Sequence, residues 1–220
     1  MTAAGTIDRE GFELKKPVLV CRWRLSHRRL PLKNRHMRAL LARTVNGRPV
    51  DQPLAAWVKQ HIEWTLDKGA SEHPDGVLLF VIDAEGQAAM AVGPYASLED
   101  TSLAALVSRA ARARQEAMQT GVSPETLWVA TEQGLVCGLD GAQAASGATS
   151  LVLQLAKTMG TPVQMDVGLI EAMSAGKVLA SEVFLVSDEH GIVPAANAPG
   201  PQGERMAQGY QRLLASMDKS

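Results

Sequence analysis

The stretch ASEVFLVSDEHGIVP, residues 180–194, decides how the rest of the chain is interpreted. An apolar run at 183–186 is followed by a polar cluster at 187–191, and apolar residues resume before Pro194. Val, Ile and Phe favour a pleated, half-buried surface. Ser-Asp-Glu-His-Gly is typical of a turn in which the glycine takes a positive φ. The stretch therefore predicts a strand, a tight polar turn and a second strand.

A second feature, ASGATS at residues 145–150, opens an apolar-periodic run that ends before the sequence GTP at 160–162. Small polar residues at the start, with Gly and Pro beyond the end, are start and stop signals of a helix. The N-terminus of a helix offers free backbone N–H groups and the positive end of a dipole, which suit an anion. A helix start followed by a strand and a polar turn is an order in which a phosphate cradle can be built.

These segments carry a family resemblance. The sequence GAT at 147–149 before the helix, then SEVFL at 181–185, GIVP at 191–194 and PGP at 199–201, resembles the C-terminal half of the fold-type IV pyridoxal-phosphate enzymes. That family includes the class IV aminotransferases and the 4-amino-4-deoxychorismate lyases. VLVCRWRL at 18–25, followed by RHMR at 35–38, is similar to the N-terminal strand and helix of a small-protein branch of the family. The resemblance covers most of the chain in order.

The resemblance implies an α+β fold with the two-domain architecture of D-amino acid aminotransferase. It also implies a homodimer and makes pyridoxal phosphate a possible cofactor. We interpret the sequence GPY at 93–95 as the linker between a smaller N-terminal domain, residues 1–94, and a larger C-terminal domain, residues 95–220. The C-terminal domain would contain the phosphate-binding helix start.

Periodicity predicts the individual elements. Further strands are expected at 17–25, 77–82, 87–92, 126–130, 135–137 and 163–167, and helices at 32–44, 54–68, 97–120, 149–159, 169–175 and 205–217. Ser97 with Asp100 three residues later resembles a capping box at the start of the 97–120 helix. A Pro- and Gly-rich loop is expected at 198–203.

Composition excludes some classes of function. The chain has 220 residues, 46% apolar and 20% charged, and a net charge of −1, which suits an ordinary globular protein with no overall bias toward nucleic acid or membrane. The longest strongly apolar run, 76–82, is far too short to span a bilayer. The sequence MTAAGTID at the start shows no secretion signal, and the context of the two cysteines suggests neither a disulfide scaffold nor a metal site. We therefore expect a reduced cytoplasmic protein.

The resemblance also names site residues. It places cofactor binding at Gly147, Ala148 and Thr149, with Ser187 in the phosphate-facing turn. Arg38 is the candidate for an arginine that reaches the pocket. The five histidines have no metal-ligand spacing, so no metal site is expected.

The residues that catalysis in this family requires are missing from the matching positions. A pyridoxal-phosphate enzyme needs a lysine that bonds to the cofactor and later moves the substrate proton. In the family it lies just past the linker, but this chain has no lysine between residues 68 and 157, and Asp100 or a neighbour takes the place. The family's glutamate beside the pyridine nitrogen is replaced by Gly138, and the arginine after the helix start by Ser150. Asp188 in the phosphate-facing turn would repel a phosphate dianion.

The N-terminal region is basic, with twelve of the 22 Lys and Arg residues between Arg9 and Arg48. One interpretation is a patch for anions or nucleic acid. The other is the solvated face of a strand and a helix. We favour the second, because little aromatic interleaving beyond Trp23 is present and nucleic-acid stacking platforms usually need more.

Three functional hypotheses result. The first is a fold-type IV protein that has lost pyridoxal-phosphate catalysis, a pseudoenzyme whose residual pocket binds a small anion or nothing. The second is an active aminotransferase or 4-amino-4-deoxychorismate lyase that uses a relocated lysine, Lys157 or Lys177. The third is nucleic-acid binding through the basic N-terminal region, a partner that the weak aromatic content does not favour.

Overall fold

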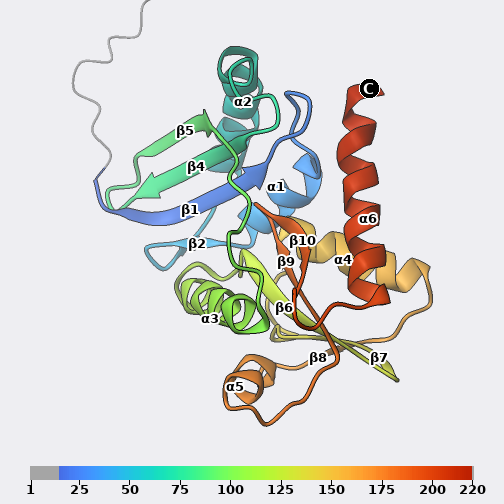
Figure 1. Cartoon of the computed structure of the whole chain (residues 1–220). Helices are drawn as coiled ribbons and strands as arrows, with labels where there is room; N and C mark the ends of the chain where they lie inside the picture. Colours follow the sequence, from blue (N-terminus) through green and yellow to red (C-terminus); the bar gives the residue numbers. More distant parts are fainter. Residues whose placement is uncertain (1–14, 220) are drawn as a thin grey trace, which may run out of the picture.

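A computed structural model describes residues 15–219, and within them the chain forms two main sheets, one short hairpin and six α-helices (Figure 1). The first sheet has the order β1-β4-β5 and the second the order β10-β9-β6-β7-β8. Among these residues no helix is both long enough and apolar enough to cross a membrane. The expected mixture of helices and sheets is confirmed.

The first sheet is antiparallel and comes from the N-terminal part of the chain. Its strands are β1 (Pro17–Arg24), β4 (Val77–Asp83) and β5 (Ala88–Gly93). Helices α1 (Lys33–Leu41) and α2 (Gln52–Gly69) contribute to its core, and β2 (Thr44–Val45) and β3 (Arg48–Pro49) form the short hairpin between them. Trp23, Leu78 and Phe80 from the sheet pack with Val58 and Ile62 of α2 in one buried cluster.

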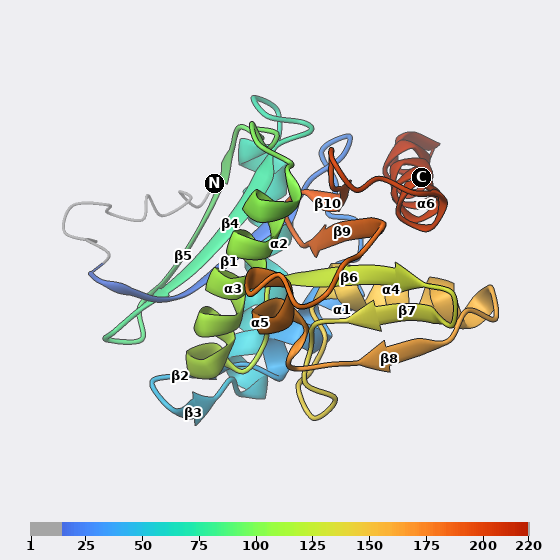
Figure 2. The ribbon, with the colours of Figure 1, turned by 60° about the horizontal axis from the view of Figure 1, so that its bottom comes forward.

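The second sheet is buried on both faces. Its strands are β6 (Glu125–Thr131), β7 (Gly134–Cys137), β8 (Val163–Met165), β9 (Glu182–Ser187) and β10 (Gly191–Pro194). Helices α3 (Leu103–Thr120) and α5 (Leu169–Ser174) lie on one side, and α4 (Gly147–Thr158) and α6 (Pro201–Ser216) on the other (Figure 2). Side chains alternate between the faces of a strand, so Trp128 packs with α4 and α6 whereas Leu127 and Val129 pack with α3 and α5.

The stretch at 180–194 forms the expected hairpin, and its turn joins the two sheets. Strand β9 pairs with β10 in the register Ser187 to Gly191, and Gly191 has a φ of 72°. The backbone N–H of Arg24 at the end of β1 donates to the carbonyl oxygen of Asp188 at 3.1 Å. The polar turn of the second sheet is thus bonded directly to a strand of the first.

Two helix starts differ from the expectation. Helix α3 begins at Leu103, because Ser102 rather than Ser97 is its N-cap: Ala105 N donates to Ser102 Oγ at 3.3 Å. The expected capping box is therefore wrong. Helix α6 begins at Pro201 instead of 205, so the expected loop at 198–203 is shorter than predicted. A proline suits a first helical turn because its missing N–H has no intrahelical partner there.

The linker expected at 93–95 follows β5 directly, and α3 begins at Leu103. The first sheet and the second sheet have separate buried clusters. The division into domains at residue 94 stays a prediction.

Candidate functional site

In the polar turn between β9 and β10, the side chain of Ser187 hydrogen-bonds to backbone groups of the same turn. The Ser187 hydroxyl accepts hydrogen bonds from the backbone N–H groups of Glu189 at 3.2 Å and His190 at 3.1 Å, and it donates to Glu125 Oε1 at 3.0 Å. The N–H groups that such a turn could offer to a bound anion already have a partner. Ser187 therefore closes the turn that the sequence predicted to face a phosphate.

The N-terminus of α4 is also occupied. Ser146 is its N-cap, and Thr149 N donates to Ser146 Oγ at 3.3 Å. Ala148 N donates to Asp188 Oδ1 at 2.8 Å. A negative charge at this end of a helix is favoured by the helix dipole. The chain itself supplies that charge, because the Asp188 carboxylate lies where a bound anion was expected.

Asp188 is paired with a buried histidine. Its side chain is 4% exposed and its Oδ2 atom lies 3.6 Å from Nδ1 of His36, whose side chain is 3% exposed. Burial raises the pKa of the Asp188 carboxyl, but the charge of His36 and the N–H of Ala148 outweigh that effect and hold the pKa below its usual value. Asp188 is therefore kept ionised inside the protein.

His36 is fixed between two elements. Its ring stacks on Trp23, with the centroids 5.2 Å apart and the planes 25° apart. On the side of α4, a Cβ atom on Gly147 would overlap the His36 ring. Gly147 is thus needed for the close approach of α1 to α4. Its role in this structure is to make room for a side chain of the same chain.

The other expected residues of the helix start lie in the core. Thr149 Oγ1 is 2.9 Å from Thr126 Oγ1 and receives a hydrogen bond from Ser146 Oγ at 3.1 Å. Trp128 Nε1 donates to Thr126 Oγ1 at 2.8 Å. The Thr149 hydroxyl therefore belongs to a buried network beneath the second sheet.

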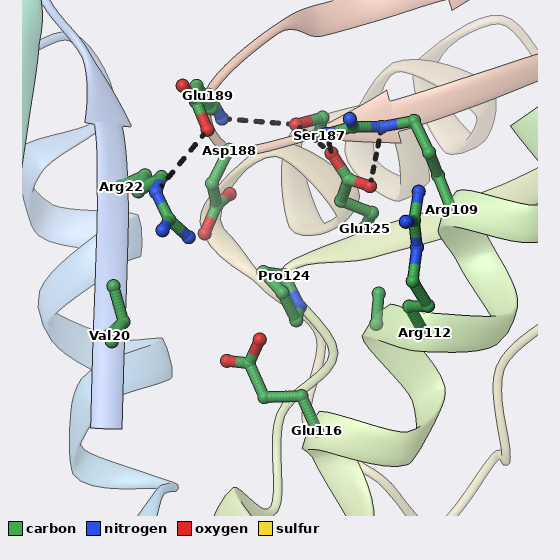
Figure 3. A pocket seen from close by; sticks show the side chains of 11 residues that line it. Val20, Arg22, Arg109, Arg112, Glu116, Pro124, Glu125, Ser187, Asp188 and Glu189 are labelled. Atoms are coloured by element: carbon green, nitrogen blue, oxygen red, sulfur yellow. Dashed lines mark hydrogen bonds and ion pairs between the residues drawn. The ribbon is translucent and has the colours of Figure 1, made fainter. Parts of the chain in front are cut away.

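A cavity of about 270 Å³ lies beside these residues, between β1, α3 and the β9–β10 turn (Figure 3). Its lining residues are Val20, Arg22, Arg109, Arg112, Ala113, Glu116, Pro124, Glu125, Ser187, Asp188 and Glu189. We call this the α3 cavity. Of the five residues that the sequence named, only Ser187 lines it, whereas Gly147, Ala148 and Thr149 are buried under the neighbouring helix start.

Charged groups face one another across the α3 cavity. Arg109 donates to Glu125 through Nε at 3.1 Å and Nη2 at 2.6 Å, a bidentate pair. Figure 3 shows Arg22 reaching in from β1, with Arg112 and Glu116 extending from α3 opposite it. These groups leave the cavity strongly polar.

The charges in the α3 cavity are unequally paired. Arg22 Nε is 3.9 Å from Glu189, and Arg112 has no ion-pair partner within residues 15–219. Burial raises the pKa of Glu116, against the opposing effect of Arg43 and Arg22. Burial likewise raises the pKa of Glu189. Arg112 is therefore the cavity's most available cation.

Arg38 does not line the α3 cavity. It is exposed on α1, and its Nε atom donates to the carbonyl oxygen of Asn34 at 3.2 Å. Arg35 on the same helix reaches α4 instead, donating from Nη1 to the carbonyl oxygen of Ser150 at 3.0 Å and to its hydroxyl at 3.2 Å. An arginine does contact α4 near its start, but it is Arg35 of α1 rather than Arg38.

Sequence reasoning missed the contributions of α3 and of His36. Arg109, Arg112 and Glu116 recur at three- and four-residue intervals, which place them on one face of a helix. That spacing could have indicated a charged helix face directed at a cleft. The pairing of His36 with Asp188 has no comparable signal, because the two residues are distant in the sequence.

These residues do not fit pyridoxal phosphate. The helix start that would hold the phosphate is closed by the Asp188 carboxylate, and none of the residues lining the α3 cavity is a lysine. Lys157, near the end of α4, and Lys177, after α5, are both exposed and do not line it. Within the described chain, a covalent attachment point is therefore missing from the cavity.

No protein-family model matches the chain, and no curated protein sequence matches it significantly. Solved structures do resemble it. A hypothetical aminotransferase from Mycobacterium tuberculosis in its apo form has a TM-score of 0.59 at 13% identity, over 96% of this chain and 95% of that one. Its PLP-bound form has a TM-score of 0.57 at 12% identity, over 96% and 95%.

Two further structures agree with this result. The 4-amino-4-deoxychorismate lyase from Pseudomonas aeruginosa has a TM-score of 0.55 at 13% identity, over 96% of each chain. A fold IV transaminase from Curtobacterium pusillum has a TM-score of 0.53 at 13% identity, over 96% of this chain and 91% of that one. At these identities the likeness concerns the fold. The chain therefore has the fold of the class IV aminotransferases and 4-amino-4-deoxychorismate lyases, the fold-type IV architecture that its sequence predicted.

Proposed function

We propose that this protein is a non-catalytic relative of the fold-type IV enzymes that binds a small anionic ligand in the α3 cavity. The observation that carries the proposal is that all the cations in the lining are arginines, Arg22, Arg109 and Arg112. The lining also contains the carboxyl groups of Glu116, Glu125, Asp188 and Glu189, and no lysine. A guanidinium stays protonated in proteins, so it does not supply the free amine that covalent chemistry with an aldehyde cofactor needs. Arginines do suit the recognition of an anion.

Two of the three arginines are free to contact a ligand. Arg109 is held by Glu125 in a bidentate pair, whereas Arg22 makes only a long contact with Glu189. A guanidinium binds a carboxylate or a phosphate through two parallel hydrogen bonds. Arg112 of α3 and Arg22 of β1 lie on opposite sides of the cavity, so both would donate hydrogen bonds to an anionic group between them.

The size of the α3 cavity limits the ligand. A volume of about 270 Å³ lies just below the range of roughly 300–1,000 Å³ typical of ligand pockets. Burial raises the pKa values of Glu116 and Glu189, which lowers the cost of protonating these two carboxyl groups when an anion binds beside them. We expect small carboxylates or phosphates of a few carbon atoms rather than a large cofactor.

Binding is tested by thermal unfolding and calorimetry against a panel of mono- and dicarboxylates and inorganic phosphate. Arg112→Ala removes an exposed cation without an ion-pair partner in the described chain, so we expect the fold to be retained. We expect at least a tenfold loss of affinity in this variant, about the worth of one charge-assisted hydrogen bond. Arg38→Ala, an exposed arginine outside the cavity, is the matched control and keeps full affinity. No saturable binding, or equal loss in both variants, would refute the proposal.

The catalytic alternative is tested separately. The protein is mixed with pyridoxal phosphate, reduced with borohydride and mapped by mass spectrometry. We expect only scattered labelling of exposed lysines, without a stoichiometric adduct or an absorption band of an internal Schiff base. One labelled lysine, Lys157 or Lys177 for example, whose mutation abolishes both signals, would establish the relocated-lysine hypothesis instead.

Nucleic acid is not a favoured partner, because several basic side chains already have contacts inside the chain. Lys33 pairs with Glu63, and the buried Arg43 donates to Thr120 Oγ1 at 3.2 Å. A filter-binding assay over a salt series decides the matter, because phosphate-backbone binding weakens steeply as salt rises. Salt-dependent affinity in that assay would revive nucleic-acid binding.

A homodimer remains our proposal for the assembly, and it rests on the family resemblance of the sequence. Sedimentation equilibrium at micromolar concentration measures the mass directly. A species of twice the 23.5 kDa chain mass is expected, and a monomer at all concentrations would exclude it.

A further inference from the structure

We infer that Asp188 is an internal anion that fills an anion-binding cradle at the start of α4, and that removal of its carboxylate opens a site for inorganic phosphate. The cradle is defined here as the backbone N–H of Ala148 together with Nδ1 of His36. This goes beyond the proposed function, which concerns the arginines of the α3 cavity.

The first support is the geometry around the carboxylate. Its two oxygens face different donors: Oδ1 accepts from Ala148 N at 2.8 Å, and Oδ2 lies 3.6 Å from His36 Nδ1. The donors come from α4 and α1, which belong to different parts of the fold. An anion with several oxygens, such as phosphate, would meet both donors without the constraint of a side-chain tether.

The second support is an unsatisfied polar atom. His36 is 3% exposed, and its Nδ1 has no hydrogen-bond partner among the described residues, since 3.6 Å to Asp188 is too long for a hydrogen bond. Buried polar atoms in proteins nearly always have a partner. The tethered carboxylate therefore satisfies the cradle only in part, and His36 still points a ring nitrogen at the anion's position.

The surroundings leave room for a free anion once the side chain is gone. Asp188 lines the α3 cavity as well as contacting α4, so the space that its side chain vacates opens into about 270 Å³. Figure 3 shows the carboxylate directed into that space from the β9–β10 turn. The side-chain atoms that Asp188→Gly removes correspond to an acetate ion. A phosphate bound to Ala148 N and His36 Nδ1 would extend from them into the α3 cavity.

Two effects keep phosphate away from the start of α4 in the unmodified chain. A tethered group competes at a high effective concentration with a free one. Like charges within a few ångströms repel strongly where water is excluded. A phosphate group would have to displace an ionised carboxylate from its contacts with Ala148 and His36. The cradle is thus blocked by the protein itself.

The experiment compares the wild type with Asp188→Gly and Asp188→Asn by thermal unfolding in phosphate, acetate or chloride at matched ionic strength. We expect Asp188→Gly to be destabilised in chloride and its melting temperature to rise by about 3–6 °C at a phosphate concentration ten times the Kd. Acetate gives a smaller rise. The wild type and Asp188→Asn keep a side chain in the cradle, so their melting temperatures rise in phosphate only by what binding to the arginines of the α3 cavity supplies, and the rise in Asp188→Gly exceeds theirs.

Two second-site variants locate the bound phosphate by calorimetry in the Asp188→Gly background. His36→Ala removes one donor of the cradle and is expected to weaken phosphate binding at least tenfold. Arg112→Ala is expected to leave the affinity within a factor of two. The opposite result would place the phosphate at the arginines and overturn the inference, while leaving the proposed function intact.

The inference can also be tested if Asp188→Gly fails to fold in chloride. If Asp188→Gly is insoluble in chloride, its refolding yield in phosphate or acetate replaces the melting temperature as the readout. A yield that rises several-fold with either anion supports the inference. No gain over chloride, or an equal gain for the wild type, overturns it.

Discussion

Replacing Gly147 with alanine tests how tightly His36 is held against α4. Gly147 is the first residue of the helix, and intrinsic propensity alone favours alanine over glycine in a helix by roughly 0.5–1 kcal/mol. The structure predicts the opposite sign. A Cβ at this position would overlap the His36 ring, and Trp23 is stacked on that ring, so His36 has little freedom to move aside.

The magnitude follows from two costs. Overpacking a filled interior typically costs about 1–3 kcal/mol. Displacing His36 also weakens its pairing with Asp188, and breaking a buried ion pair outright costs about 3–5 kcal/mol. Asp188 keeps its hydrogen bond from Ala148 at 2.8 Å, so the second cost is only partial. We expect a net loss of about 2–4 kcal/mol, or a melting temperature lower by roughly 4–16 °C for a chain of this size.

Urea unfolding followed by tryptophan fluorescence measures the free energy of unfolding. A double-mutant cycle with His36→Ala isolates the clash, because Gly147→Ala costs little once the ring is gone. Gly209→Ala in α6 is the control, since its Cβ would meet nothing closer than Leu155 Cδ1 at 3.9 Å, and it should stabilise by about 0.5–1 kcal/mol. If Gly147→Ala behaved like Gly209→Ala, the described packing of α1 on α4 would be wrong.

Three further predictions concern the β9–β10 turn and its support. Gly191→Ala should cost about 2–4 kcal/mol in urea unfolding, because it combines a positive φ with overlap of the buried Tyr210 ring. Arg109→Met should cost about 2 kcal/mol, because it leaves Glu125 with an unpaired charge, and Glu125→Gln in the same background should recover most of that loss. Burial and Arg109 lower the pKa of His190 from 6.5 to about 4, so the unfolded state takes up a proton before the folded state does. Stability should therefore fall by roughly 1–2 kcal/mol, allowing for solvent screening, between pH 6.5 and pH 4; a similar slope in His190→Gln would assign it to other groups.

The hairpin at 180–194 and the helix at 147–158 could be predicted from the sequence because their signals are local. A short apolar run, turn residues and a small polar N-cap lie within a few positions of the element that they define. The starts of α3 and α6 could not be predicted, since distant residues complete their caps. Leu103 N donates to Asn197 Oδ1 at 2.7 Å, and Gly203 N donates to Glu182 Oε1 at 2.5 Å.

The candidate site divides in the same way. The resemblance directed attention to the α4 start and the β9–β10 turn, and both lie together where the two sheets meet. It did not reveal the face of α3 that lines the cavity, nor that Arg35 rather than Arg38 reaches α4. Those contacts depend on how helices from separate parts of the chain pack, which a local pattern does not encode.

The amino-acid sequence alone determined the turn, the helix start and the lack of any lysine between residues 68 and 157, because composition and order need no coordinates. It also identified Asp188 as a carboxylate unfavourable to phosphate. Only the tertiary structure decided where that carboxylate lies. The hydrogen bond from Ala148 of α4 and the contact with His36 of α1 hold the carboxylate at the helix start, while Arg24 of β1 bonds to the backbone carbonyl of the same residue. These partners are brought together by packing across 40 or more positions of the chain.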